Sequence, residues 1–316
     1  MSRAMSVEPS YLRLYSQGLL TERIEKALAL LQPCRLCPRA CGVDRLKGET
    51  GFCETGRKAA VASAAAHFGE ESPLVGRFGS GTIFIRSCNL LCRFCQNHEI
   101  SHGKEGTEVG PEGLAALMVT LGRAGCHNIN FVTPTHVVPQ ILEALPLAIE
   151  SGLRVPLVYN SGGYDSRDTL ELLEGIFDLY MPDFKFWDNR WAERYCAAPD
   201  YREVACAAVR EMHRQVGDLA LDERGIARTG LLVRHLVMPN RIAGTEEVME
   251  FVAREIAVNT YVNVMDQYRP CGSAHGDEFI NRRLYAKEYR DAVSAAKRAG
   301  LARLDERERP RLIVMP

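Results

Sequence analysis

Six short apolar segments recur along this chain of 316 residues, and longer amphipathic segments separate most of them. The apolar segments, each a candidate strand, are 79–87, 128–133, 155–160, 177–185, 231–239 and 260–268. Helical periodicity is clear between them, as in 111–125, 137–152 and 201–217. Strands that alternate with helices at this spacing form parallel βα units with right-handed crossovers. The sequence therefore predicts an α/β fold, a partial (β/α)6 TIM-like barrel with six units instead of the usual eight.

Polar or special residues follow five of the predicted strands. These strand ends are 133–136, 160–163, 183–185, 239–240 and 266–268. In βα barrels the carboxyl ends of the strands converge on one mouth, where ligands bind. We therefore expect five separate peptides to deliver polar groups to the mouth that also receives the loop after the first strand.

Three cysteines in that first loop, Cys88, Cys92 and Cys95, have the spacing C-x3-C-x2-C. Three thiolates can hold three corners of a 4Fe-4S cube and leave one iron open to an outside ligand. A zinc site completed by His98 or His102 is an alternative, as are three incidental thiols. The position of the loop after a strand, within a βα series, favours the open cluster.

A second set of four cysteines precedes the first predicted strand. Its members, spaced C-x2-C-x3-C-x11-C with glycines between them, are Cys34, Cys37, Cys41 and Cys53. Four thiolates saturate either a zinc ion or an auxiliary iron–sulfur cluster, and the spacing suits both. We therefore predict two parts: residues 1–75, an N-terminal helix (10–31) and a four-cysteine metal-binding leader, and residues 76–316, the partial barrel with a C-terminal helix (278–299).

Four further cysteines are scattered along the chain. Cys126, Cys196 and Cys206 are predicted to be small side chains of the core. Cys271 follows the last predicted strand and is expected near the mouth, where a role as a hydrogen donor is an alternative to a structural one.

Composition narrows the class of protein further. The formal net charge of −1 is unfavourable for a long contact with nucleic acid or an anionic membrane. No apolar run is long enough to span a bilayer, and the first residues lack the apolar core of a secretory signal. We expect a cytoplasmic protein, in which clustered thiols hold metal more often than they form disulfides.

The loop "CNLLCRFCQN", with "DLYMPDFKFWD", "LLVRHLVMPN", "NVMDQYRP" and the leader "CPRACGVDRLKGETGFC", resembles the radical S-adenosylmethionine superfamily. Within it, the chain is similar to the pyruvate formate-lyase activating enzyme-like subgroup, in the branch of glycyl radical enzyme activating enzymes. The resemblance implies an oxidoreductase in which S-adenosylmethionine chelates the open iron of the cluster. One electron then cleaves the sulfonium, and the 5′-deoxyadenosyl radical abstracts hydrogen from the substrate.

The resemblance further implies a protein or peptide substrate and a reductant such as flavodoxin or ferredoxin. Two alternatives remain open. One is radical modification of a small molecule or cofactor precursor. The other, from a different class, is a non-catalytic iron–sulfur electron carrier or redox sensor, which would require four-cysteine ligation of every cluster.

The resemblance also assigns roles to particular residues. Cys88, Cys92 and Cys95 match the cluster ligands, and Phe94 matches the aromatic residue beside the adenine. Where the superfamily usually carries a glycine-glycine-glutamate-proline motif, this chain has Thr133 and Thr135. Their hydroxyls and the nearby carbonyls would then receive the ammonium group of the methionine moiety.

The remaining contacts to the cofactor are expected at later strand ends. Asn160 and Ser161 suit the ribose or the carboxylate, Asp183 suits the ribose hydroxyls, and Lys185 suits the methionine carboxylate. Gln267, between Asp266 and Tyr268, is expected on the adenine side. Arg234 and His235 lie within the fifth predicted strand, where alternation turns only one of them inward.

Overall fold

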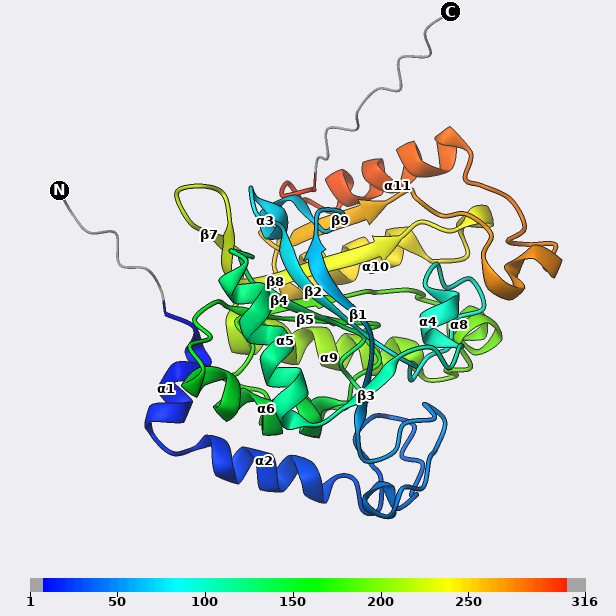
Figure 1. Cartoon of the computed structure of the whole chain (residues 1–316). Coiled ribbons are helices and arrows are strands. Elements are labelled where there is room, and N and C mark those ends of the chain that lie inside the picture. The colour runs from blue at the N-terminus through cyan, green and yellow to red at the C-terminus, as the bar shows by residue number, and fades with distance from the viewer. Residues whose placement is uncertain (1–7, 306–316) are drawn as a thin grey trace, which may run out of the picture.

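The computed structural model describes residues 8–305 as an α/β fold built on a mostly parallel sheet (Figure 1). Six strands pair in parallel and in chain order: β2 (Ser80–Ile85), β4 (Ile129–Val132), β5 (Leu157–Ser161), β6 (Leu179–Pro182), β8 (Ala227–Leu236) and β9 (Tyr261–Met265). Each of them overlaps one of the six predicted strands. The prediction of an α/β fold with a parallel sheet is thereby confirmed.

Three antiparallel strands extend the sheet. β1 (Ala59–His67) pairs with β2, β3 (Thr107–Val109) pairs with β1, and β7 (Ala220–Leu221) pairs with β8. The division of the chain at residue 75 stays a prediction, although β1 lies before that point and hydrogen-bonds to β2 after it.

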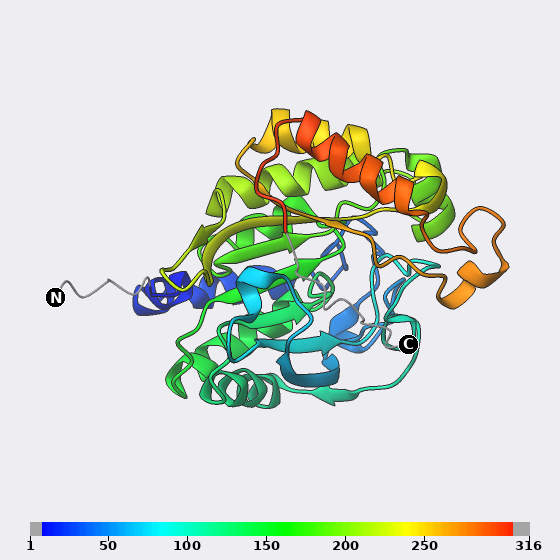
Figure 2. The ribbon, with the colours of Figure 1, turned by 90° about the horizontal axis from the view of Figure 1, so that it is seen from above.

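Helices connect the strands and follow the predicted order. They are α1 (Ser10–Ser16), α2 (Leu20–Ala29), α3 (Ser72–Val75), α4 (His98–Ser101), α5 (Pro111–Arg123), α6 (Val138–Glu150), α7 (Arg167–Leu172), α8 (Asn189–Cys196), α9 (Tyr201–Val216), α10 (Thr245–Phe251) and α11 (Ala286–Arg298), with a π-helical turn at Val252–Ile256. Seen from above, α10 and α11 lie along one side of the strands and α5 along the opposite side (Figure 2).

Two predicted helices differ from the observed ones. The segment 10–31 forms two helices, because the chain turns at Gly18, whose φ of 72° is a conformation that glycine adopts without strain. The C-terminal helix begins at Ala286 instead of 278. The preceding segment is bound elsewhere, since Tyr268 donates a hydrogen bond to the carbonyl of Ile280 and Asp277 accepts one from Tyr195.

The parallel sheet has two buried faces, as strands covered on both sides require. Residues such as Tyr159, Tyr180 and Val233 belong to the large core beneath the helices. Their strand neighbours point the other way, into a smaller inner cluster of Leu74, Val158, Leu179, Met181, Leu219, Ala227 and Leu232. We call the side of this cluster the inner face. Within residues 8–305 no ladder joins β9 to β2, so the sheet stays open on that side.

None of the helices within residues 8–305 combines the length and the apolar character that crossing a bilayer demands.

Candidate active site

The cysteine loop, residues 87–97, leaves the carboxyl end of β2 and crosses the ends of the neighbouring strands. Asn89 Nδ2 donates to the carbonyl of Tyr164 over 2.7 Å, and Gln96 Nε2 donates to the carbonyl of Gln267 over 3.1 Å. Leu90 packs on Gly162, where an added Cβ would lie only 2.6 Å from the Leu90 methyl carbon. The loop is therefore held from the end of β5 to the end of β9.

The three thiols of this loop act on one another electrostatically. Burial, and then the charge of Cys92, raises the pKa of Cys88 to about 12 and raises the pKa of Cys95 as well. The hydrogen bond with Cys196, followed by burial, raises the pKa of Cys92, whereas the charge of Lys185 opposes this rise. Cation binding would favour the thiolates, because coordinating thiols are deprotonated.

Within the described residues, no three His, Cys, Asp or Glu side chains stand in the geometry of a metal site. The rings of His98 and His102, the candidate zinc ligands, are stacked on each other with centroids 4.2 Å apart. Both metal assignments therefore stay predictions. All eleven cysteines are free thiols, so none of the seven clustered sulfurs is committed to a disulfide.

A buried ion network lies beside the cysteine loop. Asp183, just beyond β6, accepts a hydrogen bond from Lys185 Nζ at 2.6 Å through one oxygen and from Arg234 Nε at 2.8 Å through the other. Burial alone would raise the pKa of Asp183, but the two cations outweigh it and keep that pKa below its usual value. Burial would lower the pKa of Lys185, yet Asp183 and Cys92 raise it well above its usual value.

Arg234 extends this network across the inner face of the sheet. Its Nη2 donates to Asn160 Oδ1 at 2.7 Å, and its Nη1 lies 3.8 Å from the carboxylate of Glu71. Glu71, which immediately precedes α3, accepts a hydrogen bond from Asn263 of β9 at 2.8 Å. Four strands and the segment before α3 thus contribute to one set of polar groups, of which Glu71 and Asn263 were not predicted.

Arg234 and His235 are consecutive residues of β8, so their side chains point to opposite faces of the sheet. Arg234 points to the inner face, whereas His235 is fully buried and bonds the carbonyl of Phe184 at 2.7 Å and the hydroxyl of Thr245 at 2.8 Å. Burial lowers the pKa of His235 to about 4. His235 is therefore a hydrogen-bonded core histidine.

Because burial lowers the pKa of His235, we expect the free energy of unfolding to depend on pH. The unfolded chain takes up the proton near pH 6.5 and the folded chain only near pH 4, so the free energy of unfolding should fall as the pH drops between these values. The slope from one such group is at most about 1.4 kcal/mol per pH unit. Urea unfolding of the wild type and of His235→Gln between pH 7 and pH 5 checks this: the variant should show a shallower dependence, and parallel curves would contradict the assignment.

Thr135 and Ser161 direct their hydroxyls to a carboxylate that was not predicted. Asp165 accepts hydrogen bonds from Thr135 at 2.7 Å, Ser161 at 2.6 Å and Tyr159 at 2.9 Å, and its side chain is buried. Ser161 shares its strand face with Tyr159, which packs beneath the helices. The assignment of Thr135 and Ser161 to the cofactor stays a prediction, and because both hydroxyls donate to Asp165, each would meet the cofactor as a hydrogen-bond acceptor.

The other predicted contacts have different surroundings. Thr133 has a left-handed φ of 64° directly after β4, and its amide donates to the carbonyl of Asn160. The ring of Phe94 is buried in an edge-to-face contact with Phe186, with centroids 5.8 Å apart. Gln267 is exposed at the end of β9, and its carbonyl accepts the bond from the cysteine loop.

An inner-facing amide on β4 was also missed. Val132 pairs with Asn160, so Asn130, two residues earlier, lies on the same inner face. Asn130 has no exposed surface, and within the described residues neither its side-chain nitrogen nor its oxygen has a hydrogen-bond partner. Buried polar groups without a hydrogen-bond partner are rare in folded proteins. The polar position within the apolar run 128–133 was the signal that could have revealed it.

In the four-cysteine leader, three of the thiols act on the fourth, Cys37. The pKa of Cys37 is raised to about 12, first by burial and then by the charges of Cys53, Cys34 and Cys41. Gly51 permits this approach, because a Cβ there would lie 2.7 Å from the sulfur of Cys41. Four thiolates suit either zinc or an iron–sulfur cluster, so the identity of the metal stays open.

Arg39, within the leader, fastens it to the cysteine loop. Its Nε donates to the carbonyl of Asn89 at 2.8 Å, and its Nη2 donates to the carbonyl of Cys196 at 2.9 Å. Its guanidinium also lies over the rings of Phe52 and Tyr164, at 3.9 Å and 5.0 Å from their centroids. One side chain thereby joins the two cysteine clusters.

Replacing Arg39 with alanine should weaken the attachment of the leader to the cysteine loop. We expect the free energy of unfolding to fall by about 2 kcal/mol, since charge-assisted hydrogen bonds to buried carbonyls are lost. Urea unfolding measures the change, and limited proteolysis should show faster cleavage within the leader. Arg35→Ala, at an exposed position in the same leader, is the control and should change stability by less than about 0.5 kcal/mol. Equal losses in both variants would contradict the role of Arg39.

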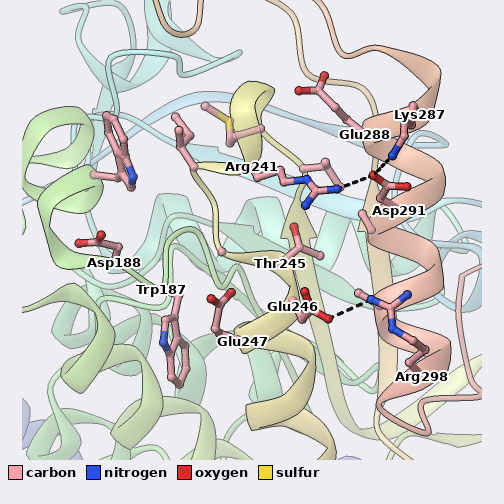
Figure 3. A pocket seen from close by; sticks show the side chains of 17 residues that line it. Trp187, Asp188, Arg241, Thr245, Glu246, Glu247, Lys287, Glu288, Asp291 and Arg298 are labelled. Carbon is pink, nitrogen blue, oxygen red and sulfur yellow. Dashed lines mark hydrogen bonds and ion pairs between the residues drawn. The ribbon is translucent and has the colours of Figure 1, made fainter.

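A separate cavity of about 460 Å³ lies between the loop before α10 and the helix α11 (Figure 3). Five of its charged side chains pair with one another: Asp291 binds Arg241 and Lys287, and Glu246 binds Arg298. No predicted site residue lines this cavity, so it is distinct from the site around the cysteine loop.

The residues described above define an α/β protein with a three-cysteine loop at the carboxyl edge of a parallel sheet. No family model matches the chain. The chain is 32% identical over 294 residues to the uncharacterized protein MJ0674 of Methanocaldococcus jannaschii, which covers 90% of this chain and 80% of the relative. The chain therefore belongs to the family of MJ0674.

Two solved structures show a more distant likeness. The radical S-adenosylmethionine methyltransferase TsrM from Kitasatospora setae matches 60% of this chain and 36% of its own, with a TM-score of 0.41 and 15% identity. The methylornithine synthase PylB matches 71% of this chain and 70% of its own, with a TM-score of 0.45 and 15% identity. TM-scores below 0.5 leave the function to be inferred from the site itself.

Proposed function

We propose that this chain is a radical S-adenosylmethionine enzyme, with a 4Fe-4S cluster on Cys88, Cys92 and Cys95 at the mouth of a partial (β/α)6 barrel. One observation carries the proposal. Cys92 of the three-cysteine loop lies close enough to Lys185 and Asp183, at the end of a parallel strand, for their charges to act on it. When bound, the cluster supplies the electron that cleaves the sulfonium of S-adenosylmethionine to a 5′-deoxyadenosyl radical.

The chain's own residues would bind and orient that cofactor. Lys185 offers an ammonium group for the methionine carboxylate, and Asp183 and Asn160 offer oxygens for the ribose hydroxyls. Asp183 also keeps Lys185 protonated and fixed in direction, through the 2.6 Å hydrogen bond. The unpartnered amide of Asn130 gives the inner face a further donor and acceptor for a bound molecule.

For the substrate, we propose a protein or peptide, as in the activating enzymes of glycyl radical enzymes. Support comes from the missing ladder between β9 and β2 in the described chain, which leaves the sheet open on one side. The reductant is proposed to be flavodoxin or ferredoxin. The leader is proposed to hold zinc or an auxiliary iron–sulfur cluster. An enzyme that acts on a small molecule would cleave S-adenosylmethionine in the same way. The two alternatives differ only in the molecule from which hydrogen is abstracted.

The test is cofactor cleavage by the anaerobically reconstituted full-length chain. With dithionite as reductant, addition of S-adenosylmethionine should yield methionine and 5′-deoxyadenosine, and should change the EPR spectrum of the reduced cluster. An electron carrier with closed ligation would instead show an unchanged spectrum and no product. That outcome would reject the enzyme, whatever its substrate.

A further inference from the structure

A fourth sulfur lies against the cysteine loop. Cys196, the last residue of α8, has its Sγ 3.2 Å from the Sγ of Cys92, and 1% of its surface is exposed. The sequence predicted Cys196 to be a simple core side chain. The core position is correct, but the contact with Cys92 gives this thiol a polar partner that a filler does not need.

The position of Cys196 is fixed from two directions. Its carbonyl accepts the 2.9 Å hydrogen bond from Arg39 of the leader. The amide of Arg93, in the cysteine loop, donates to the carbonyl of Tyr195 at 2.9 Å. Backbone contacts on both sides of the thiol therefore maintain the distance to Cys92.

The chemistry of the pair depends on which sulfur carries the proton. A cysteine that ligates iron is a thiolate and can only accept a hydrogen bond, so with a cluster bound the hydrogen bond between the two sulfurs would run from Cys196 to Cys92. Two sulfurs in hydrogen-bond contact are also too close to ligate separate irons of one cube without rearrangement. Cys196 is thus placed as a hydrogen-bond donor to a ligand.

We propose that the thiol of Cys196 donates a hydrogen bond to Cys92 and thereby raises the reduction potential of the cluster, an inference that rests on the proposed function. Hydrogen bonds to the sulfurs of a cluster are among the factors that set its potential. On reduction one electron enters the cluster and part of its charge reaches the ligand sulfur. A donor stabilises this form more than the oxidised form, while Cys196 keeps its proton and no bond is broken.

The experiment compares Cys196→Ala, Cys196→Ser and a control, Cys206→Ala, whose thiol is buried in α9. Each full-length protein is reconstituted anaerobically with iron and sulfide, and its cluster is titrated with dithionite and followed by EPR. At a fixed potential, Cys196→Ala should lower the ratio of reduced to oxidised cluster about tenfold, a shift of about 59 mV for a one-electron couple.

Cys196→Ser keeps a hydrogen-bond donor, so its reduction potential should stay closer to that of the wild type. The reduction potential of Cys206→Ala should equal that of the wild type. Equal potentials for the wild type and Cys196→Ala would overturn the inference. So would a changed EPR line shape without S-adenosylmethionine in both Cys196 variants, since that would make Cys196 a ligand. Wild-type protein that assembles no 4Fe-4S cluster would overturn the proposed function itself, and iron and sulfide analysis distinguishes this case.

Discussion

Replacing Cys92 with alanine is expected to abolish cleavage of S-adenosylmethionine while the chain stays folded. In the proposed function the loop supplies three thiolates, so removal of one would leave the cube with two of its ligands. Changes to groups behind a metal ligand already cost about 10–100-fold in affinity or activity, so loss of a ligand should exceed that. The measurements are iron content, the visible absorbance of the cluster and the rate of 5′-deoxyadenosine formation, with circular dichroism to establish folding.

The matched control for this experiment is Cys126→Ala, because Cys126 is also buried, at 2% exposure, but lies after α5. That variant should keep its cluster and its activity. Since Cys196 lies 3.2 Å from Cys92 and could replace the lost ligand, the double variant Cys92→Ala/Cys196→Ala completes the set. Full activity in the double variant would remove Cys92 from the ligand set. Loss of secondary structure in Cys92→Ala would make that cysteine structural.

Much of the fold could be predicted because strands buried on both faces are continuously apolar. The segment 155–159 has this composition and contains most of β5, and 128–133 contains β4 although Asn128, Asn130 and Thr133 interrupt its apolar residues. β1 was missed because six of its nine residues are alanine, which has little preference for strands. Its pairing with β2 is decided by tertiary contacts that no local pattern reveals.

In the candidate site, too, features that are local in sequence could be predicted and contacts between distant residues could not. Cys88, Cys92 and Cys95 could be proposed as ligands from the sequence alone, because their spacing is local in sequence. The contact of Cys92 with Cys196, by contrast, joins positions 104 residues apart. Asp165 illustrates the same limit, since only the fold brings Thr135 to it. Strand alternation predicted that only one of Arg234 and His235 faces inward, but it could not predict which.

Replacing Asp183 with asparagine should destabilise the folded chain by about 3–5 kcal/mol, because two buried cations would lose their carboxylate. The side chains of Asp183, Lys185 and Arg234 are each 17% exposed, so water compensates little for the loss. Urea unfolding at pH 7 measures the change. The folded-state pKa of Asp183 is depressed, so its contribution is present above the unfolded value of about 3.9 and is lost as the pH falls toward the folded value.

Asp188→Asn is the matched control, because Asp188 makes its ion pair with Arg190, whose side chain is 84% exposed. Exposed pairs contribute about 0–1 kcal/mol, so this variant should be nearly as stable as the wild type. A similar loss in both variants would show that burial does not decide the strength of the Asp183 pairs. If burial does decide the strength of these pairs, the double variant Asp183→Asn/Arg234→Met should be more stable than Asp183→Asn alone. The second substitution removes one of the two cations that the first leaves without a carboxylate. Cofactor cleavage should not recover together with the stability, because Lys185 would still lack the group that orients it.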